Sequence, residues 1–170
     1  DTTIEAATAF PEDPELHKQL AVLREASGDL AAAAASAKRA SELLPTCSET
    51  WVQFGIILGK QHEYNEACAA FSRAHELDLQ EVASLQNLGH ALEQTGRTKE
   101  ALRAYRLAVE TRPRFGPAWL VLGALLEQMG HKEEAADCLR KGFANRVPRE
   151  AELLALARFC QRRGWREAAA

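Results

Sequence analysis

Histidine and cysteine are the residues of this chain whose side chains could transfer protons, attack a substrate or hold a metal ion. The cysteines are Cys47, Cys68, Cys138 and Cys160, and none forms a C-x-x-C pair, so their spacing is wrong for a zinc site built from sequence neighbours. Cys68 and His75 stand seven residues apart, two turns of one helix, which is far for two ligands of one ion. We therefore expect no metal and no cofactor. An even number of cysteines leaves disulfides open, but buried or half-buried thiols in a reducing compartment such as the cytoplasm are favoured.

Proton-transfer chemistry would have to come from the histidines, and their surroundings do not favour it. The sequence contains no G-x-S-x-G, no H-E-x-x-H, no glycine-rich phosphate loop and no D-x-D calcium loop. His62 and His131 fall at or beside predicted turns, and His75 is expected to be solvated. His90, close to Glu93, lies on the inner face of a predicted helix, but a general base needs a nucleophile or substrate within reach. A binding contact is therefore favoured over catalysis at His90, and we expect no enzymatic activity.

The charge pattern argues against nucleic acid and membrane partners. The net charge is -3, and the longest uncharged apolar run, Ala31 to Ala37, is too short to span a bilayer. The N-terminus carries no positively charged, apolar leader. Basic residues gather towards the C-terminus, but the aromatic residues that would stack on bases are few there and mostly fit core positions. A solvated face is favoured, and an acidic partner at that end is the alternative.

Several residue series recur with a period of 34 residues, which indicates a repeat protein. The glycines and alanines that share this period are Gly96, Gly130 and Gly164; Gly55, Gly89 and Gly123; and Ala33, Ala67, Ala101, Ala135 and Ala169. We divide the chain into complete repeats at 14–47, 48–81, 82–115 and 116–149. Residues 1–13 are interpreted as the end of a preceding repeat and 150–170 as a partial one.

Each repeat predicts two helices joined by a short turn. The first helix carries large apolar residues at places four, seven and eleven of the repeat, as in Trp51, Phe54 and Leu58, and these spacings put them on one helical face. Place eight is small, which lets a neighbouring helix approach closely, and a glycine at place fifteen can end the helix with a positive φ. The second helix carries alanines and an aromatic residue, as in Ala67 and Phe71, so the pair can pack tightly.

This pattern resembles the tetratricopeptide repeat family, whose 34-residue period carries W-x2-L-G-x2-Y, A-x3-F and a proline. The matching residues are Trp51, Phe54, Gly55 and Leu58; Ala67 and Phe71; Leu88, Gly89 and Gly96; and Ala101, Tyr105, Ala108 and Pro113. The resemblance covers essentially the whole chain and implies an all-α, right-handed superhelical solenoid of antiparallel helix pairs. Repeat 14–47 departs from the pattern, because His17 replaces a large apolar residue and Ala37 an aromatic, so its core should be thin.

In that family the first helices line a concave groove, and the resemblance implies which residues face it here. The predicted groove residues are Val52, Gln53, Ile56, Lys60, Gln86, Asn87, His90, Gln94, Leu120, Val121, Ala124, Leu154 and Arg158. The apolar members stand at places that packing within a repeat does not need, so they predict an interaction surface unless a neighbouring helix covers them. Asn87 is the leading candidate to bind a peptide main chain, because an amide both donates and accepts hydrogen bonds.

The leading hypothesis is a non-enzymatic scaffold that binds a protein or peptide ligand in this groove, as an extended peptide or a helix. Some family members hold a C-terminal carboxylate with lysine, arginine and asparagine, but Pro117 and Val121 stand where that set would need Lys and Arg, so no such clamp is expected. Neither end of the sequence has a polar capping helix, and we therefore expect a window of a longer array. The alternatives are a substrate-recruiting arm of a larger enzyme such as a glycosyltransferase, and a self-assembly module whose ends stack.

Overall fold

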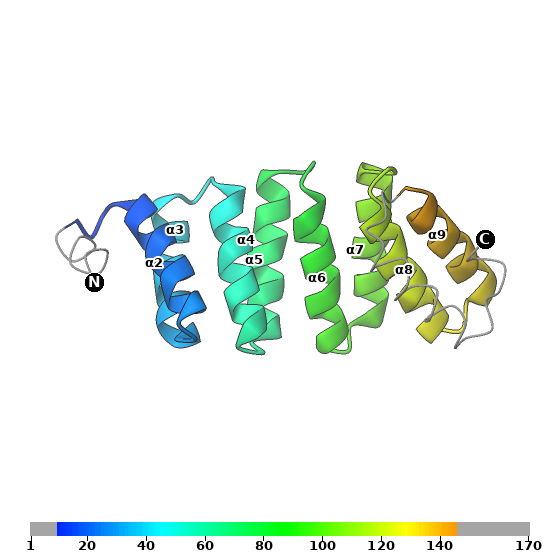
Figure 1. Ribbon diagram of the computed structural model, residues 1–170, viewed down its shortest axis with the longest axis horizontal. Helices are drawn as coiled ribbons and strands as arrows, with labels where there is room; N and C mark the ends of the chain where they lie inside the picture. The colour runs from blue at the N-terminus through cyan, green and yellow to red at the C-terminus, as the bar shows by residue number, and fades with distance from the viewer. Residues whose placement is uncertain (1–9, 146–170) are drawn as a thin grey trace. The chain divides into compact units, whose positions relative to one another are not determined.

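The computed structural model describes residues 10–145, and this part of the chain is all-helical, as predicted (Figure 1). The first helices begin at residues 14, 48, 82 and 116, so 34 residues separate successive starts, and each is followed by a second helix. The eight helices of the described residues are α2 (Pro14–Ala26), α3 (Leu30–Leu43), α4 (Ser48–Lys60), α5 (Tyr64–Leu77), α6 (Val82–Gln94), α7 (Thr98–Thr111), α8 (Gly116–Gln128) and α9 (Lys132–Ala144).

The chain forms two compact units, residues 1–104 and residues 105–170, and the boundary between them falls within α7. In the first unit α2 packs on α3, α3 on α4, α4 on α5 and α5 on α6. In the second unit α8 packs on α9. That the helix pairs form one continuous array with a right-handed superhelix stays a prediction. Most of the two predicted terminal repeats lies outside the described residues, at residues 1–9 and 150–170.

The turn inside each pair has the left-handed residue that the sequence predicts at place fifteen. Gly28, Gly96 and Gly130 have φ angles of +85°, +75° and +84°. In repeat 48–81 a histidine holds this place, and His62 adopts a φ of +63°. Because a side chain disfavours this region, His62 occupies a conformation that glycine adopts at lower cost.

In three of the four complete repeats a ring nitrogen at place four binds the linker that precedes the helix pair. The indole N–H of Trp51 donates to the carbonyl oxygen of Pro45 at 3.1 Å, and that of Trp119 donates to Pro113 at 2.7 Å. Nε2 of His17 lies 3.0 Å from the carbonyl oxygen of Pro11. A carbonyl only accepts, so Nε2 of His17 carries the proton, and this histidine replaces the tryptophan contact that its repeat lacks.

The first pair has the thin core that its sequence predicts. Ala21 on α2 packs with Ala33 and Ala37 on α3 and with Ile57 of the next repeat, and all four are fully buried. Arg24 adds polar packing, because its Nη1 donates to the Ser36 hydroxyl at 2.6 Å and to the Ala32 carbonyl at 3.2 Å. The large side chain that packs against the alanines of α3 thus comes from α4 and not from α2, the partner helix within the pair.

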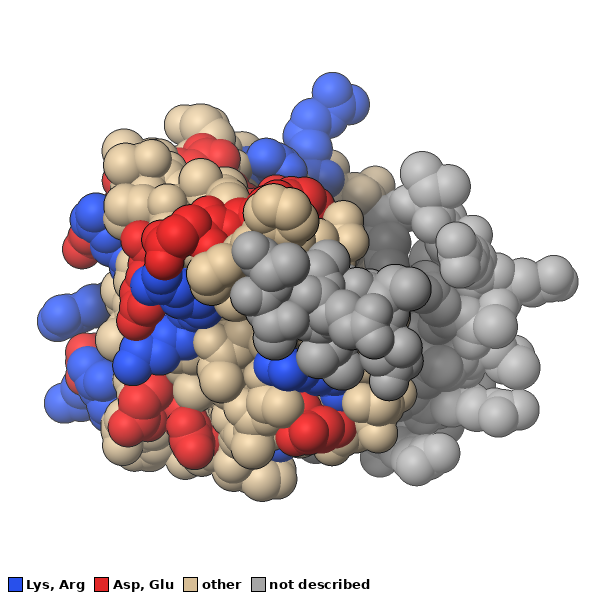
Figure 2. Space-filling view, turned by 90° about the vertical axis from the view of Figure 1, so that its left-hand side faces the viewer, with Lys and Arg blue, Asp and Glu red and all other residues tan. Residues whose placement is uncertain are grey.

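Acidic and basic side chains lie beside one another on the face at the α2–α3 end, which Figure 2 shows. Arg39 on α3 pairs there with Glu12 at 2.5 Å and with Glu42 at 3.5 Å. The sequence leans acidic in this part, but on the visible face the two signs are interspersed. Exposed pairs of this kind contribute about 0–1 kcal/mol each, so they affect solubility more than folding.

Candidate functional site

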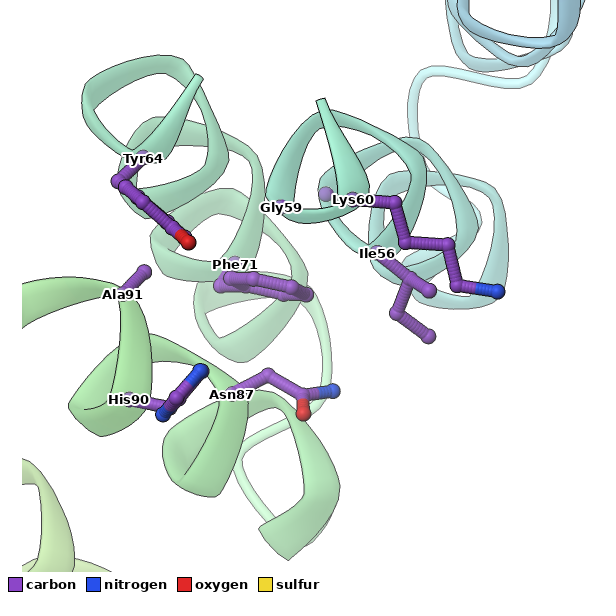
Figure 3. Close-up of a pocket in the computed structure, with 9 residues that line it drawn as sticks. Ile56, Gly59, Lys60, Tyr64, Phe71, Asn87, His90 and Ala91 are labelled. Atoms are coloured by element: carbon purple, nitrogen blue, oxygen red, sulfur yellow. The ribbon is translucent and has the colours of Figure 1, made fainter. Parts of the chain in front are cut away.

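A pocket of about 250 Å³ opens between α4, α5 and α6, all within the first unit. Figure 3 shows its lining: α4 contributes one side, α6 the opposite side, and an aromatic ring from α5 lies between them. The lining residues are Gly55, Ile56, Gly59, Lys60, Tyr64, Phe71, Asn87, His90 and Ala91. Concave sites with an apolar lining and a few polar groups are where proteins most often bind ligands.

The floor of the pocket depends on the glycine at place eight of repeat 48–81. Phe71 is 3% exposed and its ring packs against Gly55, where a Cβ atom would stand 2.7 Å from Cε1 of the ring. The close approach of α4 and α5 that the sequence predicts is therefore present. Ile56, the next residue of α4, lies on the solvent side of the pocket and is 37% exposed, whereas Ala91 on α6 is buried. These residues give the pocket an apolar interior with an apolar edge.

The polar groups of the pocket come from all three helices. Lys60 lies one turn after Ile56 on α4, and Asn87 and His90 lie one turn apart on α6. In Figure 3 the amide of Asn87 extends from α6 towards the α4 side of the pocket. The hydroxyl of Tyr64, on α5, is 2.8 Å from Nδ1 of His62, and the two rings meet edge to face. Donors and acceptors therefore stand around an apolar interior, the arrangement that orients a bound chain.

Two ion pairs join α2 to α4, one of them at the pocket residue Lys60. Lys60 pairs with Glu25, and Lys18 pairs with Glu49 at 3.7 Å. The ammonium group of Lys18 also donates to the carboxylate of Glu15 at 3.2 Å. This hydrogen bond raises the pKa of Lys18 above its ordinary value. These ion pairs involve exposed side chains, so each contributes little to the packing of α2 beside α4.

Four of the predicted groove residues meet in this pocket: Ile56, Lys60, Asn87 and His90. The remaining predicted residues of the first unit do not line it: Val52, Gln53 and Gln86 are half-buried and Gln94 is exposed. Val121 and Ala124 are half-buried on α8 in the second unit. Leu154 and Arg158 lie outside the described residues. That any of these residues binds a ligand stays a prediction.

Leu120 does not occupy the free position predicted for it. A Cβ atom added at Gly142 on α9 would stand 2.8 Å from Cγ of Leu120 and 3.2 Å from the carbonyl oxygen of Gly116. Leu120 therefore packs within its own helix pair, over a glycine that stands where other repeats have alanine. The sequence pattern missed this because it treats place five as surface and does not couple it to the second helix.

His75 also differs from its prediction, because it is half-buried and its Nδ1 atom is shielded from solvent. The same place of the neighbouring repeats holds Ser41, 1% exposed, and Val109, 5% exposed. This place is buried in the two neighbouring repeats, and comparison between the repeats could have predicted that His75 is not fully solvated.

The thiols of the described residues are buried or half-buried, as predicted. Cys47, Cys68 and Cys138 are free, the first half-buried and the other two buried; Cys160 lies outside the described residues. Burial raises the pKa of the Cys68 and Cys138 thiols, which disfavours the nucleophilic thiolate. Within residues 10–145, no group of three or more potential metal ligands is found.

Sequence analysis did not place Gly55, Tyr64, Phe71 and Ala91 in a site. Phe71 and Gly55 were assigned to packing between the two helices, which is also what they do. The missing signal is spatial, since a pocket between three helices depends on how the third helix stands beside the first pair. In the described part of the chain, none of the helices is both long and apolar enough to span a membrane.

Two family models, each described as a tetratricopeptide repeat, match residues 82–125 and 116–144. A search of curated proteins finds no match to the chain. Among solved structures, a crystal structure of MamA aligns with a TM-score of 0.78 and 23% sequence identity over 84% of each chain. MamA from Desulfovibrio magneticus RS-1 aligns with a TM-score of 0.76 and 20% identity over 84% of this chain and 81% of that one.

The structure of YrrB, described as a TPR protein with an unusual peptide-binding site, aligns with a TM-score of 0.69 and 21% identity over 99% of this chain and 87% of that one. At such identities the likeness of the structures shows the shared fold alone. The helix pairs that recur every 34 residues, the left-handed turn within each pair and the two family matches over residues 82–144 together show that the chain contains tetratricopeptide repeats.

Proposed function

We propose that the chain is a non-catalytic interaction module that binds a peptide or helix of a partner protein at the pocket between α4, α5 and α6. The observation that carries this proposal is the combination of an apolar interior, an exposed Ile56 at its edge and the half-buried Asn87 in its lining. Main-chain groups of a peptide need both donors and acceptors, which an amide supplies, while apolar anchors contribute most of the affinity.

The structural likeness to YrrB supports a peptide as the ligand, since that protein is described as having a peptide-binding site. The free thiols support a reducing compartment, and we propose a cytoplasmic location. A substrate-recruiting role within a larger enzyme stays a prediction that sequence beyond the present chain would test.

The test is a selection of peptides from a random 12-residue display library against the immobilised chain, followed by fluorescence anisotropy on the enriched peptides. We expect Ile56→Glu to weaken binding by roughly tenfold or more, because a carboxylate would be desolvated at the edge of an apolar pocket. Leu79→Glu is the matched control, since Leu79 is 61% exposed and does not line the pocket. Enriched peptides that bind wild type and Ile56→Glu equally well, or the absence of any enriched peptide, would refute the proposal.

A second candidate function, self-association, has one specific observation in its favour. Leu23 on α2 is 53% exposed, whereas its counterparts one, two and three repeats later, Ile57, Ala91 and Leu125, are at most 2% exposed. In the interior of the first unit this place is covered by the preceding second helix, as α3 covers Ile57. An equivalent surface on a second copy could cover Leu23. Sedimentation velocity across a wide concentration range checks this, and a monomer mass at every concentration would exclude it.

A further inference from the structure

Gly59 differs from its counterparts in the other complete repeats. Place twelve is glutamate in the other three, at Glu25, Glu93 and Glu127. Only repeat 48–81, which contributes most of the pocket, has glycine there, and Gly59 lines the pocket. Glycine in place of glutamate leaves this position of the pocket without a side chain and without a negative charge, and among the four complete repeats this occurs in repeat 48–81 alone.

The fold itself does not require a glycine at this position. A Cβ atom added at Gly59 would meet nothing within 4 Å, in contrast to Gly55, where it would meet the ring of Phe71. Gly59 lies in the last turn of α4, and the left-handed residue that ends this helical segment is His62, three residues later. Because glycine is less favourable than alanine in a helix, Gly59 lowers helix stability without an internal contact that explains it.

Glycine at a surface position without an internal reason is typical of a place where another backbone comes close. The charge around the pocket points to the chemistry of that backbone. None of the nine lining residues is acidic, whereas Lys60 on α4 and His90 on α6 stand on opposite sides of the pocket (Figure 3). A glutamate at place twelve would add a carboxylate to this rim, which would repel an acidic ligand.

Building on the proposed function, we propose that the pocket binds an extended peptide whose main chain lies against α4 at Gly59, with a large apolar side chain over Phe71 and an adjacent acidic residue facing Lys60 and His90. The apolar side chain fills the space between α4 and α6, and the carboxylate of the ligand takes the place of the glutamate that this repeat lacks. The Lys60 ammonium group has three donors, and one of them is directed at Glu25, so the ligand carboxylate would share this lysine with Glu25.

Two substitutions of Gly59 separate this role from a structural one. Gly59→Ala should leave the melting temperature equal to or above that of wild type, because the added methyl group meets nothing. The same variant should weaken peptide binding about tenfold, because the methyl group separates the two main chains. Gly59→Glu should weaken binding of acidic peptides further than binding of neutral ones. Ala69→Glu, on an exposed site of α5 that does not line the pocket, is the control for added charge.

The probes are the peptides enriched by the library selection, together with versions in which every Asp and Glu is replaced by Asn and Gln. An enrichment of acidic residues next to a large apolar residue, with loss of affinity in the amide versions and in Gly59→Ala, supports the inference. Peptides that depend on Ile56 but show no acidic preference, or that bind Gly59→Ala as tightly as wild type, overturn it while the proposed function stands. A selection that enriches no peptide overturns both.

Discussion

Replacing Gly55 by alanine tests how the pocket floor is built. A Cβ atom at residue 55 would stand 2.7 Å from Cε1 of Phe71 and 2.9 Å from both Cδ1 and Cζ. Real carbon atoms do not approach so closely, and Phe71 is only 3% exposed, so its ring cannot swing into solvent without leaving a cavity. Either α4 and α5 move apart or the ring shifts within a packed core.

The expected magnitude combines two opposing terms. Overpacking of a core costs about 1–3 kcal/mol, while exchange of glycine for alanine in a helix contributes about 1 kcal/mol in the opposite direction. We expect Gly55→Ala to destabilise the chain by about 1 kcal/mol in the presence of Phe71. When Phe71→Ala has removed the ring, the same substitution should stabilise the chain by about 1 kcal/mol. The coupling energy of the double-mutant cycle is then about 2 kcal/mol.

Urea unfolding followed by circular dichroism measures all four corners of this cycle. Phe71→Ala alone removes about 3–5 kcal/mol, so Phe71→Leu serves as a second background that keeps the chain folded. The first repeat gives a natural precedent, because Ala21 and Ala37 hold the two equivalent places and both are fully buried. If Gly55→Ala raised stability by the same amount with and without Phe71, the close contact would not limit the approach of the helices and the argument would be wrong.

Three further predictions concern other parts of the fold. For residue 62 we expect the stability order Gly, His, Ala. Both variants lose the exposed hydrogen bond to Tyr64, but glycine also relieves a left-handed φ that costs about 1 kcal/mol, whereas alanine keeps that cost. Urea midpoints that place alanine above histidine would contradict this. Gly142→Ala should be roughly neutral alone and stabilising by about 1 kcal/mol in a Leu120→Ala background, and equal effects in both would show that Leu120 does not pack there. Burial raises the pKa of Cys68, so as the pH rises the Cys68 thiol loses its proton in the unfolded chain at a lower pH than in the folded chain. The stability advantage of wild type over Cys68→Ala should therefore shrink as the pH rises from 7 through about 9 and beyond, and an advantage that stayed constant would contradict the assigned burial effect.

The helix pairs could be predicted from the sequence because each carries several independent signals of the same period. Glycine at place fifteen predicted the left-handed turns, and His62 shows that the backbone keeps this conformation where the residue changes. Alanines on the second helices and spaced leucines on the first predicted the buried faces, since burial follows helical periodicity.

The pocket could be predicted only in part, because its residues belong to three helices whose spacing no local pattern encodes. Ile56 and Asn87 were found because a family pattern assigns their places to a surface. Phe71 was missed as a lining residue because it also packs against Gly55, and one side chain can serve both purposes. The packing contact of Leu120 was not predicted because it depends on the absence of a side chain at Gly142, a pairwise compensation that a place-by-place comparison does not register.

The ring N–H bonds to proline carbonyls give the chain a pair of optical probes. Trp51 belongs to the first unit and Trp119 to the second, and each indole is tied to the linker that precedes its own helix pair. Loss of that bond moves the indole from a fixed, half-buried setting into water, which changes its emission. With Trp165 and one of the other two tryptophans replaced by phenylalanine, fluorescence follows the melting of one unit alone. The same contacts that join successive repeats thus report whether the two units unfold in one step or in two.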